Sequence, residues 1–166
     1  MASLSARYDY EHIFIDNNSQ DKTASILRDL AAKHPQVKVI LNARNFGHIR
    51  SPYYGLLQST GDAVISMVAD LQDPPQMIPD FIKKWEEGYE NIYMHVLKRR
   101  GTGPIRSFNS SAFYWLAGKL TDNRIPKNVS DYRLLDRKVY EAVRNMKERN
   151  RFVRGLVAWV GFKSIG

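Results

Sequence analysis

The sequence contains no cysteine in its 166 residues, which excludes disulfide bonds and thiolate metal sites. No apolar run approaches the roughly 18 residues of a membrane-spanning helix. The amino terminus also lacks the apolar segment of a secretion signal. We therefore expect a soluble chain that is compatible with a reducing cytosol.

Acidic residues are outnumbered, with 17 Asp and Glu against 25 Lys and Arg, for a net charge of +8. This balance predicts an anionic partner, which is a nucleotide, a phospholipid surface or a nucleic acid; charge alone does not choose among them. The chain has no P-loop, no Gly-x-Gly-x-x-Gly and no Ser/His/Asp arrangement, and its His residues lack metal-ligand spacing. These absences remove several common catalytic classes.

The residues that are present alternate between strand and helix patterns. This alternation predicts an α/β domain, with a mostly parallel sheet that helices cover on both faces. We expect one domain over 1–166, with 1–10 as a loose leader. Strands are predicted at 12–16, 37–41, 63–68 and 91–96, and helices at 21–33, 51–58, 77–85, 107–120 and 136–146.

Two carboxylates, Asp70 and Asp73, follow the apolar strand that begins at Ala63, and Pro74 and Pro75 come directly after them. Ligands bind at the carboxyl ends of strands in such sheets, and hard carboxylate oxygens suit Mg²⁺ or Mn²⁺. Asp70 and Asp73 are therefore candidate metal ligands. For Asp73 an equally weighted alternative is that it caps the helix that starts at the prolines.

Asp16 also ends a predicted strand, where a carboxylate can accept hydrogen bonds from a base or ribose. The alternative is a helix-entry loop with Asn18 or Ser19 as the cap and Asp21 in the first turn. Gly47 either lets the backbone approach a ligand or takes a left-handed turn. The late arginines, which are Arg149, Arg151 and Arg154, either bind phosphate or form a solvated basic face.

Six segments, in this order and spacing, resemble the polyprenyl-phosphate type of family-two glycosyltransferases, which includes relatives of dolichol-phosphate mannosyltransferase and of undecaprenyl-phosphate glucosyltransferases. Together they span about residues 8 to 163. They are His12-Ile-Phe-Ile-Asp-Asn-Asn-Ser-Gln-Asp21, Asn45-Phe-Gly47, Gly61-Asp62, Ala69-Asp-Leu-Gln-Asp-Pro-Pro75, Ser130-Asp-Tyr-Arg-Leu-Leu-Asp-Arg137 and Arg151-Phe-Val-Arg-Gly155.

The resemblance implies a GT-A fold and a metal-assisted, inverting transfer of a sugar from a UDP- or GDP-sugar to a polyprenyl phosphate. It implies Mg²⁺ or Mn²⁺ as cofactor, an anionic membrane surface as a further partner and a place at the inner face of the cytoplasmic membrane. Nucleic acid is not an expected partner. By this resemblance the catalytic residues are Asp131 and Arg133, the metal ligands are Asp70 and Asp73, and the nucleotide-sugar residues are Asp16, Asn45, Asp70, Gln72, Arg151 and Arg154.

The chain departs from the family pattern at specific positions. Val68 stands where the first acid of Asp-x-Asp is expected, which leaves Asp70 as the only acid of that pair. Tyr132 replaces a phenylalanine. The chain also begins after the family's first strand, which predicts a partial domain with an exposed sheet edge that favours self-association. The alternative functions are a non-catalytic nucleotide-sugar-binding module of this fold and, on charge alone, a nucleic-acid-binding domain.

Overall fold

The computed structural model describes residues 7–95, 129–147 and 153–166. The chain divides into two compact units, of which the first holds 1–64 with 148–151 and the second holds 65–147 with 152–166. The single domain predicted over 1–166 stays a prediction. Some predictions lie outside the described residues, namely the helix at 107–120, residues 1–6 of the loose leader, and the roles of Arg149 and Arg151.

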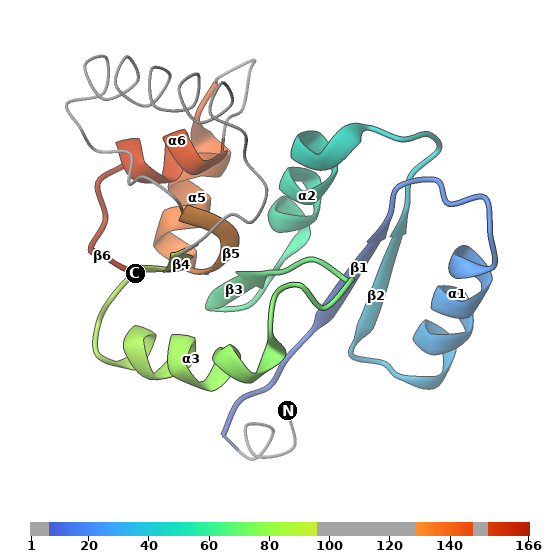
Figure 1. Ribbon diagram of the computed structural model, residues 1–166, viewed down its shortest axis with the longest axis horizontal. Helices are drawn as coiled ribbons and strands as arrows, with labels where there is room; N and C mark the ends of the chain where they lie inside the picture. Colours follow the sequence, from blue (N-terminus) through green and yellow to red (C-terminus); the bar gives the residue numbers. More distant parts are fainter. Residues whose placement is uncertain (1–6, 96–128, 148–152) are drawn as a thin grey trace, which may run out of the picture. The chain divides into compact units, whose positions relative to one another are not determined.

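The first unit contains a parallel pair of strands, β1 (His12–Asp16) and β2 (Val37–Leu41), in register from His12 opposite Val37 to Asp16 opposite Leu41. Figure 1 shows α1 (Thr23–Lys33) beside β2 and α2 (Gly47–Gln58) beside β1. Because the two strands are parallel, their carboxyl ends meet at one edge. The polar loops after Asp16 and Leu41 therefore lie next to each other.

Helix α2 begins at Gly47, four residues earlier than the sequence pattern predicted. Gly47 has a φ of 82°, so the left-handed turn weighed for this glycine is confirmed. The Asn45 side chain accepts a 2.8 Å hydrogen bond from the Gly47 N–H, which satisfies one donor at the helix start. A side-chain contact of this kind leaves no apolar periodicity in the sequence. This explains why the sequence pattern predicted a later start for α2.

The second unit contains a sheet of order β3-β5-β4-β6, and β3 (Ala63–Ser66) crosses the boundary between the units. Strand β4 (Asn91–His95) pairs antiparallel with β5 (Val129–Asp136) and parallel with β6 (Ser164–Ile165). The α/β class is confirmed, and the β4–β5 pair is antiparallel within a sheet that was expected to be mostly parallel.

Helices cover this second sheet. The short η1 (Pro75–Met77) leads into α3 (Ile78–Glu86), and α5 (Arg137–Asn145) follows β5 directly, with Asp136 as its cap. A further helix, α6 (Val153–Trp159), packs against α5. In Figure 1, α3 lies on one side of the β4–β5 pair and α5 with α6 on the other. No helix within the described ranges combines the length and apolar character that a bilayer span requires.

Strand β5 separates the second unit into two layers, because successive side chains point to opposite faces. On one face Tyr132 packs against Phe81, and Asp136 accepts a 2.7 Å hydrogen bond from the Trp85 indole N–H. On the other face Asp131 pairs with Arg154 of α6. Large side chains fill the core of the described residues around this strand; those with under 2% exposure are Tyr132, Tyr140, Leu134, Val139, Val143 and Val157.

Candidate functional site

The acidic turn, which we define as Val68 to Asp73, follows β3 in the second unit. Asp70 Oδ1 accepts a 3.1 Å hydrogen bond from the Gln72 N–H, and Asp70 Oδ2 accepts a 2.6 Å bond from the Gln72 side-chain amide. Leu71 between them has a φ of 61°, a left-handed conformation that is costly for leucine. The turn therefore holds the exposed Asp70 carboxylate at a defined place after the strand.

Asp73 does not cap a helix, so that alternative was wrong. Its Oδ2 accepts a 2.9 Å hydrogen bond from the Val68 N–H, which closes the acidic turn on itself. The residue before η1 is instead Pro74, which has no side-chain cap. Asp73 thus fixes the turn while keeping a second carboxylate oxygen, so it remains a proposed metal ligand beside Asp70.

Val68 presents a half-exposed apolar side chain at the start of the acidic turn, with 47% of its surface accessible. Its backbone N–H donates a hydrogen bond to Asp73, but its side chain has no carboxylate that could bind a metal ion. Among the described residues there is no group of three or more His, Cys, Asp or Glu placed to hold a metal ion. A cation at this turn would therefore need ligands from a bound phosphate or from water in addition to Asp70 and Asp73.

A charged cluster lies on the opposite face of β5 and consists of Asp131, Arg133 and Arg154. Arg154 donates to both carboxylate oxygens of Asp131, with 2.6 Å between Arg154 Nε and Asp131 Oδ1. Such a bidentate pair fixes the orientation of both planar groups. Because two guanidinium groups face one carboxylate, the cluster carries a net charge of +1 and suits a phosphate.

Arg133 is buried, with only 4% of its surface accessible. Burial is the main cause that lowers the pKa of its guanidinium to about 10; neighbouring Asp131 opposes this shift and Arg154 contributes to it. The group is still protonated at pH 7, since that pH lies well below its pKa. One of its N–H groups donates to the Ser130 carbonyl at 3.0 Å, which holds the side chain against its own strand.

The polar edge of the first unit carries Asp16 and Asn45, both predicted to bind the nucleotide sugar. Asp16 is buried, and its carboxylate accepts hydrogen bonds from the Ser19 hydroxyl and, at 3.1 Å, from the Ser19 N–H. Neither Asn18 nor Ser19 caps α1, contrary to the alternative considered for this loop; the cap position is Lys22, and Asp21 accepts from the Thr23 N–H at 2.9 Å.

Sequence analysis missed Asn17, which connects the ends of β1 and β2. Its side-chain Nδ2 donates a hydrogen bond to Asn45 Oδ1 at 2.8 Å. Its side-chain Oδ1 accepts from the Phe46 backbone N–H at 2.9 Å and from the Asn42 side-chain amide at 3.2 Å. The signal was present, since asparagines follow both predicted parallel strands. Asn45 is thus oriented by a neighbour from the adjacent strand end.

The structure therefore groups the predicted residues within each unit. Asp70, Gln72 and Asp73 share the acidic turn, and Asp131, Arg133 and Arg154 share the charged cluster, all in the second unit. Asp16 and Asn45 share the polar edge of the first unit. Carboxylates after a strand, an arginine–carboxylate cluster and a polar strand edge are features of enzymes that bind phosphorylated ligands.

The chain belongs to glycosyltransferase family 2, whose family model matches residues 1–144. Among its relatives it is 44% identical over 154 residues to the uncharacterized glycosyltransferase YkcC of Bacillus subtilis, covering 93% of this chain and 48% of the relative. It is 38% identical over 154 residues to the bactoprenol glucosyl transferase of Shigella phage SfX, covering 93% of this chain and 50% of that protein.

The fold also resembles a solved structure, the mannosyltransferase PcManGT from Pyrobaculum calidifontis in complex with GDP-Man and Mn²⁺. The TM-score is 0.55 at 17% identity, and the match covers 93% of this chain and 44% of the other. The predicted GT-A fold is confirmed by this likeness and by the family match. The chain spans about half the length of the curated relatives it matches.

Proposed function

We propose that this chain is the catalytic domain of an inverting glycosyltransferase that moves a sugar from a nucleoside diphosphate sugar to a polyprenyl phosphate. The observation that supports this most is the charged cluster on β5, where Asp131 orients Arg154 beside the buried Arg133. The names of the bactoprenol glucosyl transferase relatives support the lipid acceptor. The proposed donor is a UDP- or GDP-linked sugar.

The proposed chemistry requires no strong general base. A lipid phosphate is already an anionic nucleophile, so one of its oxygens attacks the anomeric carbon as the bond from that carbon to the diphosphate breaks. The new carbon–oxygen–phosphorus linkage forms on the opposite face of the sugar, and no proton needs to move. Arg133 and Arg154 would stabilise phosphate charge, and Asp131 would hold Arg154 in position rather than act as a base.

The acidic turn fits a divalent cation, although with few protein ligands. Asp70 and Asp73 offer hard carboxylate oxygens, and Gln72 already contacts Asp70 at 2.6 Å and would keep its orientation. When bound, Mg²⁺ or Mn²⁺ supplies charge that neutralises the departing diphosphate. We assign Asp16 and Asn45 of the first unit to the nucleoside, and Arg151, outside the described residues, to the phosphates.

Calorimetry with UDP and with GDP tests this proposal, in Mn²⁺ and in EDTA. We expect one of the two nucleotides to bind at least about tenfold more tightly with Mn²⁺, since the cation links diphosphate and carboxylates. Transfer is then measured with radiolabelled UDP- and GDP-sugars and undecaprenyl phosphate. Absence of nucleotide binding at every metal concentration would refute the proposed function.

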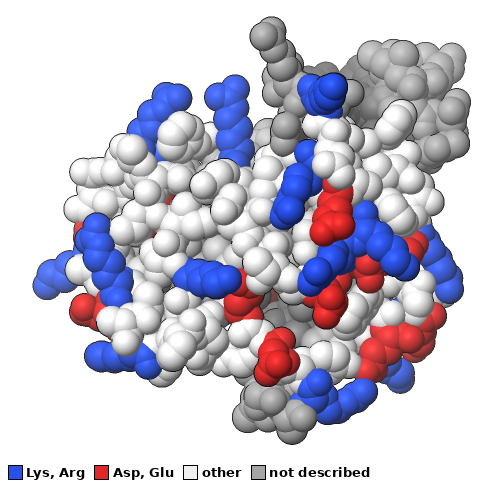
Figure 2. Space-filling model, turned by 180° about the vertical axis from the view of Figure 1, so that it is seen from behind, with Lys and Arg blue, Asp and Glu red and all other residues white. Residues whose placement is uncertain are grey.

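Val68 favours a second candidate function, a nucleotide-sugar-binding module without turnover. Its exposed apolar side chain leaves the acidic turn with Asp70 and Asp73 as the only carboxylates. Nucleotide binding without sugar transfer in the assay above would select this module. A nucleic-acid-binding domain is less well supported, because acidic and basic side chains are interspersed on the described surface seen in Figure 2; strongly salt-dependent DNA binding would be needed to support it.

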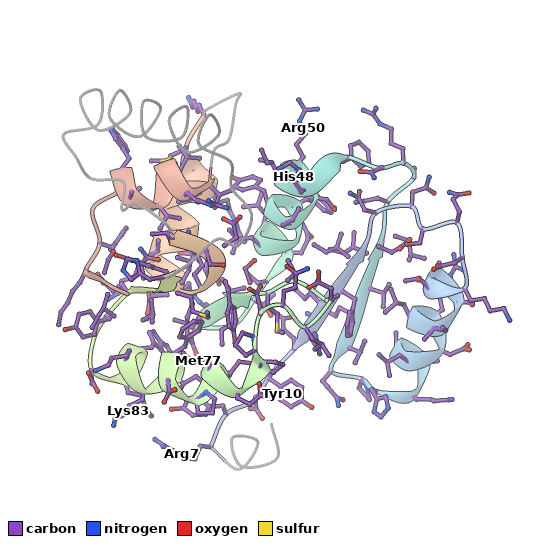
Figure 3. All side chains as sticks on the ribbon, in the orientation of Figure 1. Arg7, Tyr10, His48, Arg50, Met77 and Lys83 are labelled. Atoms are coloured by element: carbon purple, nitrogen blue, oxygen red, sulfur yellow. The ribbon has the colours of Figure 1, made fainter. Side chains whose placement is uncertain are left out.

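We also propose that the protein contacts an anionic membrane surface at the cytoplasmic face. A stripe of exposed residues at i, i+3, i+4 and i+8 runs along the start of α2: Phe46, Ile49, Arg50 and Tyr54. Figure 3 shows Arg50 pointing away from the ribbon. No Asp or Glu occurs in residues 30–61, so this stripe combines apolar and cationic groups, as membrane-surface helices do.

Vesicle sedimentation checks the membrane contact. We expect the chain to sediment with vesicles that contain phosphatidylglycerol and not with phosphatidylcholine alone. The double variant Ile49→Ser, Arg50→Gln is expected to weaken this binding at least about fivefold, because one arginine near an anionic surface contributes about 1 kcal/mol. The control is Ile26→Ser, Arg28→Gln on α1, where both side chains are exposed and the acidic Asp29 directly follows Arg28. An equal loss of vesicle binding in both double variants would contradict the assignment of the membrane contact to α2.

A further inference from the structure

Tyr132 is a core residue of the second unit that carries a polar group. Its side chain has 0% exposure, and its ring packs against Phe81 with 4.9 Å between the ring centroids. The hydroxyl group donates a 2.8 Å hydrogen bond to the carbonyl of Pro74, which directly follows Asp73. A bond across 58 positions of the sequence thus joins the middle of β5 to the end of the acidic turn.

The position of Tyr132 within β5 gives this bond its significance. Its two neighbours, Asp131 and Arg133, point to the other face of the strand and belong to the charged cluster. One short piece of backbone therefore holds the charged cluster on one side and the acidic turn on the other. Since a strand is stiff over three residues, a shift of Pro74 relative to Tyr132 changes the spacing between carboxylates and arginines.

We propose that Tyr132 is a positioning residue, whose hydroxyl fixes the acidic turn relative to β5, the strand that carries Asp131 and Arg133. This inference rests on the proposed function. The ring supplies the packing contact with Phe81, and the hydroxyl makes a separate hydrogen bond to the Pro74 carbonyl. The hydroxyl therefore adds an attachment point that the packing does not require.

Two further observations agree with this role. Burial, with a contribution from Asp73, raises the pKa of the Tyr132 hydroxyl, so the group stays protonated and remains a donor. The Pro74 carbonyl also accepts a 3.1 Å hydrogen bond from the Met77 N–H. Loss of the tyrosine hydroxyl would therefore leave this carbonyl with a partner, and the fold would tolerate the change.

The experiment uses Tyr132→Phe, which keeps the ring and removes only the hydroxyl. We expect the Mn²⁺ concentration that half-saturates nucleotide binding to rise about tenfold, the low end of the effect of groups that orient metal ligands. In the transfer assay kcat falls while KM for the lipid phosphate changes little, since the charged cluster is intact. Amide hydrogen exchange at Val68 and Gln72, whose N–H groups bond to Asp73 and Asp70, becomes faster.

The matched control is Trp85→Phe. It removes a 2.7 Å hydrogen bond between α3 and Asp136, which connects the same helical layer to the same strand away from the acidic turn. We expect Trp85→Phe to lower the thermal stability. The Mn²⁺ concentration that half-saturates nucleotide binding and the amide exchange at Val68 and Gln72 should remain unchanged. Wild-type values in Tyr132→Phe, or equal shifts in both variants, would overturn the role of the hydroxyl.

The outcomes also separate this inference from the proposed function. If the unmodified chain binds no nucleotide with Mn²⁺, the proposed function fails. The amide exchange still decides whether Tyr132 holds the acidic turn, because that measurement requires no ligand. Faster exchange at Val68 and Gln72 in Tyr132→Phe alone would support the attachment, and unchanged exchange would refute it.

Discussion

Asp70→Asn is expected to reduce metal-dependent sugar transfer by about 100-fold or more. The substitution keeps the size of the side chain and one oxygen acceptor for Gln72, but it removes the charge that a divalent cation requires at the acidic turn. Metal stabilisation of a leaving phosphate is worth several kcal/mol, and each 1.36 kcal/mol is about tenfold in rate. The loss is measured as kcat and as the Mn²⁺ dependence of nucleotide binding.

Two comparison variants make this expectation specific. Asp80→Asn removes the same charge from the exposed first turn of α3, and activity should remain near that of the unmodified chain. Val68→Asp adds a carboxylate at the start of the acidic turn, and it should tighten Mn²⁺ binding. If Asp70→Asn and Asp80→Asn behave alike, the acidic turn is not the metal site.

Arg154→Ala is expected to lower kcat about 100-fold, the scale observed when one preorganised donor to developing charge is removed. Stability should change little, because the Asp131 carboxylate is exposed, and pairs with an exposed partner contribute about 1 kcal/mol or less. The comparison of kcat with the denaturant midpoint separates the two effects. A loss of activity that tracks unfolding would contradict a role in catalysis.

Arg154→Lys distinguishes charge from shape. Lysine keeps the positive charge but cannot make the two parallel bonds that Arg154 makes to Asp131, so only part of the activity should return. Arg144→Ala is the control, because Arg144 lies in the last turn of α5, where its guanidinium lies over the Tyr140 ring. It should leave kcat unchanged.

Local patterns predicted much of this fold because they depend on neighbouring residues. The apolar runs at 12–16 and 37–41 became β1 and β2 with the predicted bounds, and the acids at 70 and 73 do follow a strand. The third strand nevertheless ends at Ser66, two residues before the predicted end, because the backbone N–H of Val68 bonds to Asp73 instead of a neighbouring strand.

Contacts between distant residues could not be predicted in the same way. The hydrogen bond from Tyr132 to Pro74 and that from Trp85 to Asp136 join positions 58 and 51 residues apart, respectively, and neither leaves a periodic signal. The burial of Arg133 was equally hidden, since a charged residue in a sequence pattern is normally assigned to the surface. These contacts arise from packing between layers.

The left-handed Leu71 has a consequence for how the acidic turn responds to disturbance. A non-glycine residue in this conformation costs about 1 kcal/mol or more, so the turn keeps its shape only while Asp70, Asp73 and Tyr132 retain their hydrogen bonds. Loss of any of these bonds allows Leu71 to relax to ordinary backbone angles. The turn then behaves as one local unfolding unit, in which both carboxylates are presented together or lost together.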